Sequence, residues 1–386
     1  MFNHAYHLFS VDLGVSGGKD FCLRPVFRLR QIFQQLMRKL YSLNLELNKG
    51  NRIESTDFLR GIAACFVMLF HFTLAGLPDT NPLKLLGGHG FLGVEVFFIV
   101  SGFIIPYSMY VAGYNKNMVG SFLTKRIIRI HIPYLAIAVV EIILIYVTSL
   151  TPWKDDGMER LDGYGIWLHG FYLNDIMGEP WLVPIFWSLA IEIQYYLLIA
   201  LLFPLLSSAK IQIRVLTIAV MALSTFVLQQ PTPLFFNYSL LFLMGIVAFQ
   251  FMVGIIKPGE FWITLAALFV LMYLKHSWMT VGVTAATLAV ILFARIRWKW
   301  SDFLGMISYS LYLVHLPFGG RLLLLTLKVG IRTEWLVSVL IVVYLIATIF
   351  VAWIFYLLVE KPAMGLAKRA AARLAPVRPK EGAQRA

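Results

Sequence analysis

The chain contains more long apolar segments than the core of a soluble domain could bury. A helix that crosses a lipid bilayer needs about 20 mostly apolar residues. Ten segments come close to this length: 58–77, 88–110, 132–151, 183–206, 212–228, 234–254, 260–274, 279–294, 303–327 and 335–358. Charged residues make up 14% of the chain, compared with about 25% in soluble domains. The sequence therefore predicts an all-α fold, a polytopic membrane helical bundle of about ten transmembrane helices.

Two other classes of chain are excluded by composition. Hydrophobic residues make up 59% of the sequence, and a disordered chain needs low hydrophobicity. The two cysteines, Cys22 and Cys65, lie in a basic tail and in an apolar run. This arrangement does not fit a disulfide-stabilised scaffold.

The distribution of basic residues predicts how the bundle is oriented. An even number of spans places both termini on one side of the membrane. If that side is the cytoplasm, the cytoplasmic segments hold twenty-five Lys and Arg residues and the outer connections hold six. Because cytoplasmic segments are enriched in Lys and Arg, we expect both termini to be cytoplasmic. This asymmetry accounts for the net charge of +13 without a nucleic-acid partner.

Three regions are expected along the chain. Residues 1–53 form a cytoplasmic extension, in which residues 24–47 show the spacing of an amphipathic basic helix on the inner leaflet. A start codon assigned too far upstream is the alternative explanation of this extension. Residues 54–365 form the transmembrane domain and residues 366–386 a basic cytoplasmic tail. The interrupted aromatic segment 161–177 is expected at the outer surface or as a re-entrant piece.

Ionisable side chains inside the apolar segments are candidates for function, because each costs roughly 2.5–3.5 kcal/mol to insert. They are Arg60, His71, Glu95, Glu141, Glu192, His315 and, at a membrane edge, Glu360. Arg60 and His71 are separated by three helical turns, so they share a face and lie about 16 Å apart along the axis. A histidine in a span acts either in helix packing or as a base. Glu95 is expected close in depth to His71, where it either orients the imidazole or reaches the outer interface.

Further polar groups recur at helical spacing. Lys125, Arg126 and Arg129 are expected at the cytoplasmic face, either to bind phosphate or to anchor the helix. Two further sets each share a helix face: Ser188, Glu192 and Tyr196, and Ser308, Tyr312 and His315. Glu141 is expected to be structural or paired across helices, and Glu360 resembles a boundary charge. The scattered histidines and the absence of a Cys cluster or HExxH indicate no metal site.

Six short motifs follow one another along the bundle. They are Arg60-x10-His71, FFIVSGF at 97–103 with Glu95 before it and Ser101 within it, Arg126-x-x-Arg129, Trp187-Ser188-Leu189 followed by Glu192, SYSLYLVH at 308–315, and VEKP at 359–362. In this order they resemble the membrane acyltransferase family 3, the bacterial O-acyltransferases of cell-surface glycans. The resemblance covers residues 54–365. Pro133 stands one place later than in the common form of the family, and His131 is unusual there.

The resemblance implies a multi-pass O-acyltransferase of the bacterial inner membrane. The donor would be cytoplasmic acyl-CoA, with acetyl as the expected group and no permanently bound cofactor. The acceptor would be a hydroxyl of a surface or exported glycan, such as exopolysaccharide or lipopolysaccharide, or of a lipid-linked precursor.

The resemblance also implies roles for individual residues. His71 would act as base or acyl carrier. The implied catalytic residues are His71, Glu95 and Arg60, and the implied acyl-CoA-binding residues are Arg126, Arg129 and Lys125. The implied substrate or structural residues are Ser101, Trp187, Ser188, Glu192, Tyr312, His315 and Glu360.

Two other functions fit the same charges. In a transporter or flippase for a glycan or lipid-linked precursor, Arg60, Glu192 and His315 would line a path and no covalent bond would change. In a non-catalytic subunit of a polysaccharide assembly complex, loss of His71 would leave function intact. Turnover of acyl-CoA separates the enzyme from the transporter.

Overall fold

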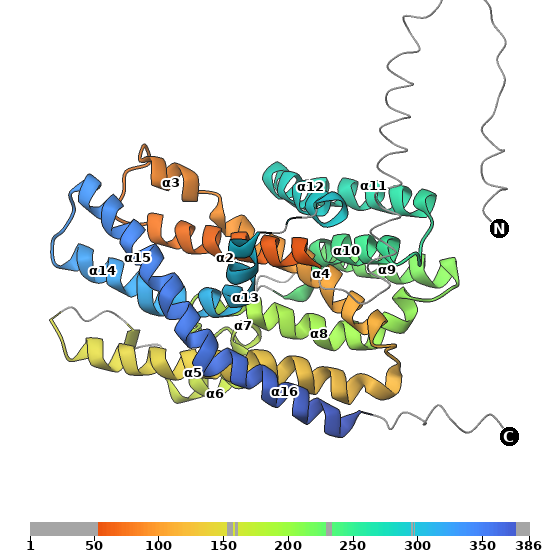
Figure 1. Cartoon of the computed structure of the whole chain (residues 1–386), viewed down its shortest axis with the longest axis horizontal. Helices are drawn as coiled ribbons and strands as arrows, with labels where there is room; N and C mark the ends of the chain where they lie inside the picture. The colour runs from red at the N-terminus through yellow and green to blue at the C-terminus, as the bar shows by residue number, and fades with distance from the viewer. Residues whose placement is uncertain are drawn as a thin grey trace, which may run out of the picture.

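The computed structural model describes residues 53–152, 157–158, 161–228, 234–294, 296 and 298–375. Within these residues the chain is helical and contains no strand (Figure 1). The main helices are α2 (Glu54–Thr73), α3 (Pro82–Gly87), α4 (Gly93–Val111), α5 (Val119–Ser149), α6 (Gly163–His169), α7 (Asn174–Met177), α8 (Phe186–Leu206), α9 (Ile211–Val227), α10 (Phe235–Met252), α11 (Pro258–Lys275), α12 (Trp278–Phe293), α13 (Lys299–Val314), α14 (Arg321–Lys328), α15 (Glu334–Phe355) and α16 (Lys361–Leu374). The amphipathic helix expected at 24–47 lies outside the described residues.

All ten predicted apolar segments are helical. Eight helical segments are long and apolar enough to cross a membrane by length and composition. The two shorter ones, α9 and α12, have 17 and 16 residues, which correspond to about 25 Å of helix. The all-α, multi-pass prediction is confirmed, whereas the count of ten spans and the cytoplasmic termini stay predictions.

Helix α10 lies in the interior of the bundle and is apolar on every side, as expected of a helix without a solvent face. It packs closely against α4, and the crossing depends on Gly102 and Gly245. A Cβ atom on Gly102 would collide with the carbonyl of Phe242, and one on Gly245 with the carbonyl of Ile99. Small residues allow this backbone-to-backbone approach in membrane helices.

Helix α2 packs between α4 and α13 and thereby joins motifs that are distant in sequence. Gly90 and Gly93 lie against the backbone of α2, a close approach that glycine permits. On the other side, Gly305 of α13 lies against the backbone of Asp57. These contacts bring Arg60 near the motifs of the second and ninth apolar segments.

Two turns of π-helix interrupt the last two apolar segments. The first, His315–Gly320, joins α13 to α14, and the second, Tyr356–Glu360, joins α15 to α16. A π-turn holds an extra residue and recurs at functional sites. His315 begins the first turn and Glu360 ends the second, so both candidate residues lie where the helix is irregular.

The segment 161–177 is interrupted as predicted, with the short helices α6 and α7. His169 is buried. Its Nδ1 lies 2.9 Å from the carbonyl of Gly165, and the N–H of Leu182 donates to its Nε2 at 2.9 Å. Because a carbonyl only accepts, the Nδ1 carries the proton and the ring is neutral. Burial lowers the pKa of His169, which favours the same neutral form.

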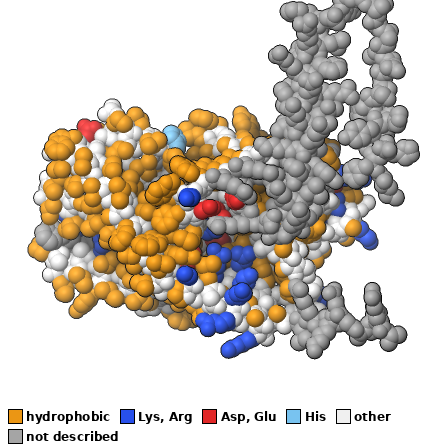
Figure 2. Space-filling model, viewed as in Figure 1, with side chains coloured by type: hydrophobic (Ala, Val, Ile, Leu, Met, Phe, Trp, Pro, Cys, Tyr) orange, Lys and Arg blue, Asp and Glu red, His pale blue; other side chains and the backbone are white. Residues whose placement is uncertain are grey.

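The surface of the bundle is largely apolar on the face shown in Figure 2. Lys and Arg side chains gather toward its lower edge, where Figure 1 places α16. Helix α16 carries Lys361, Lys368, Arg369 and Arg373. The beginning of the predicted basic tail is therefore helical and packs along α5.

Candidate functional site

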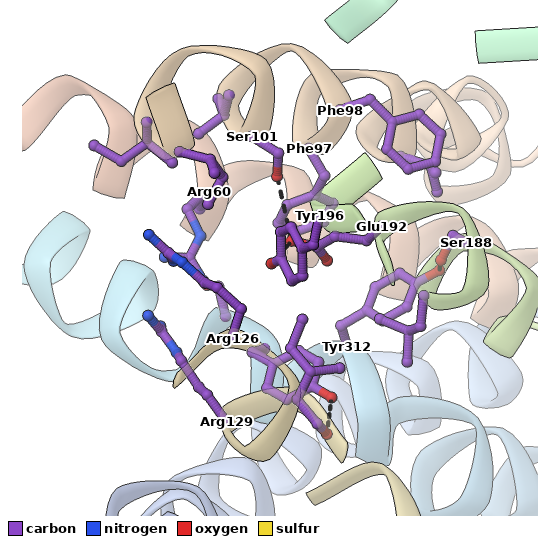
Figure 3. Close-up of a pocket in the computed structure, with 18 residues that line it drawn as sticks. Arg60, Phe97, Phe98, Ser101, Arg126, Arg129, Ser188, Glu192, Tyr196 and Tyr312 are labelled. Carbon is purple, nitrogen blue, oxygen red and sulfur yellow. Dashed lines mark hydrogen bonds between the residues drawn. The ribbon is translucent and has the colours of Figure 1, made fainter. Parts of the chain in front are cut away.

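Five helices, α2, α4, α5, α8 and α13, enclose a cavity of about 90 Å³ inside the bundle (Figure 3). Seven of the predicted site residues line it: Arg60, Ser101, Arg126, Arg129, Ser188, Glu192 and Tyr312. The remaining lining residues are mostly apolar or aromatic. The motifs that are scattered along the sequence thus meet around one internal space.

One wall of the cavity is basic. Figure 3 shows Arg60, Arg126 and Arg129 on the same side, with their guanidinium groups close together. Arg126 Nη2 donates to Ser108 Oγ at 2.7 Å, and its guanidinium lies 5.9 Å from the ring centroid of Phe122. Planar guanidinium groups suit phosphate oxygens, which they bind through paired hydrogen bonds. We call these three residues the arginine wall.

Glu192 is the one carboxylate among the residues that line the cavity. Its Oε1 accepts a hydrogen bond from the Tyr196 hydroxyl and a longer one, of 3.4 Å, from Ser101 Oγ. Arg60 and Arg126 both lie within electrostatic range of this carboxylate. A charge inside a helical bundle needs such partners. With three arginines and one glutamate, the lining keeps an excess of positive charge.

The opposite end of the cavity is closed by a hydroxyl pair. Ser188 Oγ and Tyr312 Oη are 2.6 Å apart. Both hydroxyls also lie within hydrogen-bond distance of the carbonyl of Ile185, at 3.0 and 3.2 Å. The pair fixes α8 to α13 and orients the Tyr312 ring.

Beyond Tyr312, two histidines face one another. The ring centroids of His71 and His315 are 5.3 Å apart, and those of Tyr312 and His315 are 5.7 Å apart. His315 is fully buried, and its Nδ1 lies 2.7 Å from the carbonyl of Tyr312, so Nδ1 carries the proton. Its Nε2 has no hydrogen-bond partner among the residues that the structure describes. The sequence did not predict this pair, because spacing along one helix does not show which helices meet.

Glu95 does not pair with His71, which was one of its two predicted roles. Its Oε1 accepts a hydrogen bond of 3.0 Å from Thr280 Oγ1 of α12, and its Oε2 is buried without a hydrogen-bond partner within the described part of the chain. The neighbouring Gly93 contacts Ala63, which precedes His71 by about 12 Å along α2. Glu95 therefore lies at a different depth and faces another helix.

Glu360 is not a boundary charge. It is buried, and Ser310 Oγ donates to its Oε2 at 2.6 Å. Arg60 and Arg129 both lie within electrostatic range of its carboxylate. Glu360 thus supports the arginine wall from outside the cavity lining.

The other predicted residues lie outside the cavity lining. Trp187 packs against Phe98 and Tyr238, with ring centroids 6.4 and 5.5 Å apart. Lys125 lies within electrostatic range of Lys368 in α16. Glu141 forms an ion pair with Arg321, which confirms the alternative that it is paired across helices.

Two tyrosines that line the cavity received no predicted role. Tyr196 follows Glu192 by one helical turn, so the shared face was a usable signal. Tyr309 lines the cavity and donates its hydroxyl to the carbonyl of Ile130 at 2.8 Å. It was missed because it is not on the face shared by Ser308 and Tyr312. The Tyr196 hydroxyl donates to Glu192 and the Tyr309 hydroxyl to the residue that follows Arg129, so both tyrosines are held beside the arginine wall.

Comparison with known proteins agrees with the resemblance seen in the motifs. Residues 53–357 match the model of acyltransferase family 3, described as an acyltransferase domain. A peptidoglycan O-acetyltransferase of Listeria monocytogenes, OatA, is 27% identical over 157 residues, which cover 38% of this chain and 23% of that protein. The acetyltransferase candidate ORF330 of Acidianus two-tailed virus is 26% identical over 331 residues, which cover 77% of this chain and 93% of that protein. No solved structure matches the chain.

Proposed function

Because the chain belongs to acyltransferase family 3 and is a multi-pass helical acyltransferase, we propose that it moves an acetyl group from acyl-CoA to a glycan hydroxyl. The donor is bound from the cytoplasmic side of the bacterial inner membrane. The acceptor belongs to a surface or exported glycan. The observation that supports this proposal is the arginine wall of the central cavity, whose other end is lined by Tyr312, the ring that packs against His315.

The arginine wall fits the donor. Acyl-CoA carries several phosphate groups, and guanidinium groups bind phosphates through charge-assisted hydrogen bonds. The cavity of about 90 Å³ is too small for a whole CoA molecule but suits its acyl-bearing end. From Arg60 to His71 the distance along α2 is about 16 Å, which an extended pantetheine arm would span.

His71 is the proposed reactive group. Two routes are open to it: it removes the proton of the acceptor hydroxyl, or it first takes the acyl group on a ring nitrogen. His315, whose ring centroid lies 5.3 Å from that of His71, is proposed to position the His71 ring. Glu95 and Arg60 stay predicted catalytic residues, and Glu95 would act from the side of α12 rather than through His71.

The test uses membranes that contain the wild type or His71→Ala. They receive acetyl-CoA with a labelled acetyl group, and alkali-labile label in the glycan fraction is measured. We expect a loss of about 10²–10⁴-fold in the variant, the range of a positioned acid or base. His89→Ala serves as the matched control, because His89 is exposed in the connection before α4.

Each other outcome has a clear meaning. Equal label in wild type and His71→Ala, at equal protein level, would remove His71 from the mechanism. No label in the wild type with acetyl-CoA, succinyl-CoA and a broad panel of glycans would contradict the acyl-CoA proposal. If such membranes still exported the glycan, the transporter would be the better hypothesis.

A further inference from the structure

Helix α16 lies outside the part of the chain that matches the acyltransferase model, which ends at residue 357. It continues the last apolar segment beyond the second π-turn and lies along α5 (Figure 1). Three of its alanines are buried, each one turn after the last: Ala363, Ala367 and Ala371. Because small residues let two helices approach closely, packing fixes the position of α16 against α5.

One hydrogen bond sets the register between α5 and α16. Ser121 Oγ donates to the carbonyl of Ala371 at 2.9 Å, and the two helices run in opposite directions (Figure 1). One turn after Ser121 comes Lys125, and one turn before Ala371 comes Ala367, which Lys368 follows. Lys125 and Lys368 therefore reach the same level, about 6 Å along the helices from this hydrogen bond. We call these two residues the lysine pair.

The charges around the lysine pair are all of one sign. Among the described residues, the charged groups that act on Lys125 are Arg126, Arg129 and Lys368. Neither 116–130 nor 361–374 contains Asp or Glu. Like charges on neighbouring turns repel one another, and a bound anion would relieve that repulsion.

The lysine pair continues the arginine wall toward the surface. Lys125 precedes Arg129 by four residues, so the two share a face of α5. Arg129 lines the cavity (Figure 3), whereas Lys125 and Lys368 are exposed. Basic groups thus run without a break from the surface into the cavity. This arrangement favours an extended ligand with several phosphates over a lipid head group, which would meet the lysine pair alone.

We propose that the lysine pair binds the 3′-phosphate of acyl-CoA. The inference rests on the proposed function, because it extends the donor site beyond the cavity. Coenzyme A carries a diphosphate next to its pantetheine arm and one further phosphate on the ribose at its far end. With the arm directed toward His71 and the diphosphate at the arginine wall, the ribose phosphate comes to lie further out, on the side of the lysine pair. An ammonium group binds such a phosphate as a point charge.

The test compares two ligands that differ in this one phosphate, CoA and 3′-dephospho-CoA. Titration calorimetry measures their affinities for the purified full chain in nanodiscs of phosphatidylcholine. We expect the wild type to bind CoA about tenfold more tightly, the size of one hydrogen bond to a charged group. Lys368→Ala should lose most of this preference and bind 3′-dephospho-CoA as the wild type does.

Arg369→Ala is the matched control, since it removes one positive charge from the same helix. Arg369 is exposed and follows Ala367 by two residues, about 200° around the helix, so it faces away from α5. This variant should keep the wild-type preference for CoA. Lys125→Ala removes the other member of the lysine pair and should lose the preference from the side of α5. Size-exclusion profiles report folding of each variant.

Three results would overturn the proposal. One is an unchanged preference for CoA in both Lys125→Ala and Lys368→Ala. Another is an equal loss of preference in Arg369→Ala, since the net charge of α16 would then be responsible. The third is a preference that disappears when phosphatidylglycerol replaces phosphatidylcholine, because the lysine pair would then hold lipid head groups.

Acyl transfer separates this proposal from the proposed function. Lys368→Ala should raise the KM for acetyl-CoA about tenfold at unchanged kcat, because the lost contact is uniform binding far from the reacting atoms. Transfer by the wild type with an unchanged KM in Lys368→Ala would contradict the lysine pair alone. A preference for CoA that depends on Lys368, with no transfer from any acyl-CoA by the wild type, would contradict the proposed function and leave the phosphate site standing.

Discussion

The central cavity and an apolar groove of about 560 Å³ between α5, α14 and α15 lie near the two ends of the stretch Tyr312–Pro317, yet their linings differ in character. The cavity gathers three arginines around one carboxylate, whereas the groove is apolar apart from four polar side chains. Burying charge in a bundle costs free energy that only partners can offset, but an apolar groove in lipid costs little. The charged lining of the cavity therefore calls for a functional explanation, whereas contact with lipid is enough to explain the apolar lining of the groove.

The largest effect on stability is expected at the ion pair between the groove and the core. Glu141→Ala leaves Arg321 without its carboxylate partner, and breaking a buried pair typically costs about 3–5 kcal/mol. Replacing both residues with leucine removes both charges, so the double variant should regain most of this loss. Thermal unfolding in detergent measures both.

The stability of the double variant shows whether the charges at the groove serve structure alone. Near-wild-type stability of the double variant would make the pair a structural feature of the groove wall. If the double variant were as unstable as Glu141→Ala, the hydrogen bond from Arg321 to Thr148 would be the stabilising contact instead.

The next effect concerns the arginine wall. Arg126→Ala should raise the KM for acyl-CoA about 10–100-fold, the loss of one or two charge-assisted hydrogen bonds to phosphate. Arg126→Lys should recover part of this loss because it restores the charge without the planar fork. Steady-state kinetics on the purified chain would check both.

The matched control is Arg332→Ala, since Arg332 lies exposed in the connection between α14 and α15. An unchanged KM in Arg126→Ala would show that Arg126 of the arginine wall does not bind acyl-CoA. The wall would then have to serve the acceptor or the stability of the bundle.

A smaller effect is expected from His315, which lies between the cavity and the groove. His315→Gln should lower kcat about tenfold, a loss of about 1.4 kcal/mol, comparable to one hydrogen bond. It should leave the KM for acyl-CoA unchanged. Because the proposed role is to position His71, the pH profile of kcat should also shift. A fall in kcat with an unchanged pH profile would indicate a purely structural role for His315.

Hydropathy predicted the helices well because each apolar segment is itself the unit that must form a helix in lipid. The predicted segments 212–228 and 279–294 were already as short as the helices α9 and α12, which have 17 and 16 residues. The π-turn at Glu360 was missed, whereas Pro317 marks the turn that begins at His315 as a place where an α-helix is interrupted.

The candidate site was predicted in its parts but not in its pairings. Helical spacing gives the face and depth of a residue, so Glu192 could be assigned to the interior of the bundle and Arg60 and Arg126 to its cytoplasmic half. It does not give the neighbouring helix. Glu95 contacts Thr280 rather than His71, because Gly90 and Gly93 set how α4 lies against α2. His71 faces His315 because α13 packs on another side of α2, where Gly305 lies against Asp57.

The smallest predicted effect lies outside the membrane-spanning segments, at His169. Burial holds the pKa of His169 below its ordinary value of about 6.5, so the unfolded chain binds more protons than the folded one as the pH falls below 6.5. Stability should therefore decrease as the pH drops through this range, by at most about 1.4 kcal/mol per pH unit. Protonation of Nε2 would also end the hydrogen bond from the Leu182 N–H.

Thermal unfolding at pH 7.5 and pH 5.5 measures this decrease, and His169→Gln provides the comparison. The glutamine carbonyl oxygen accepts a hydrogen bond but does not titrate, so the variant should be less stable at pH 7.5 and lose less stability on acidification. An equal loss in both proteins would place the acid sensitivity elsewhere. The buried charges around the cavity would then be the source of the acid sensitivity. The cavity and the groove would in that case differ in how far they make stability depend on pH.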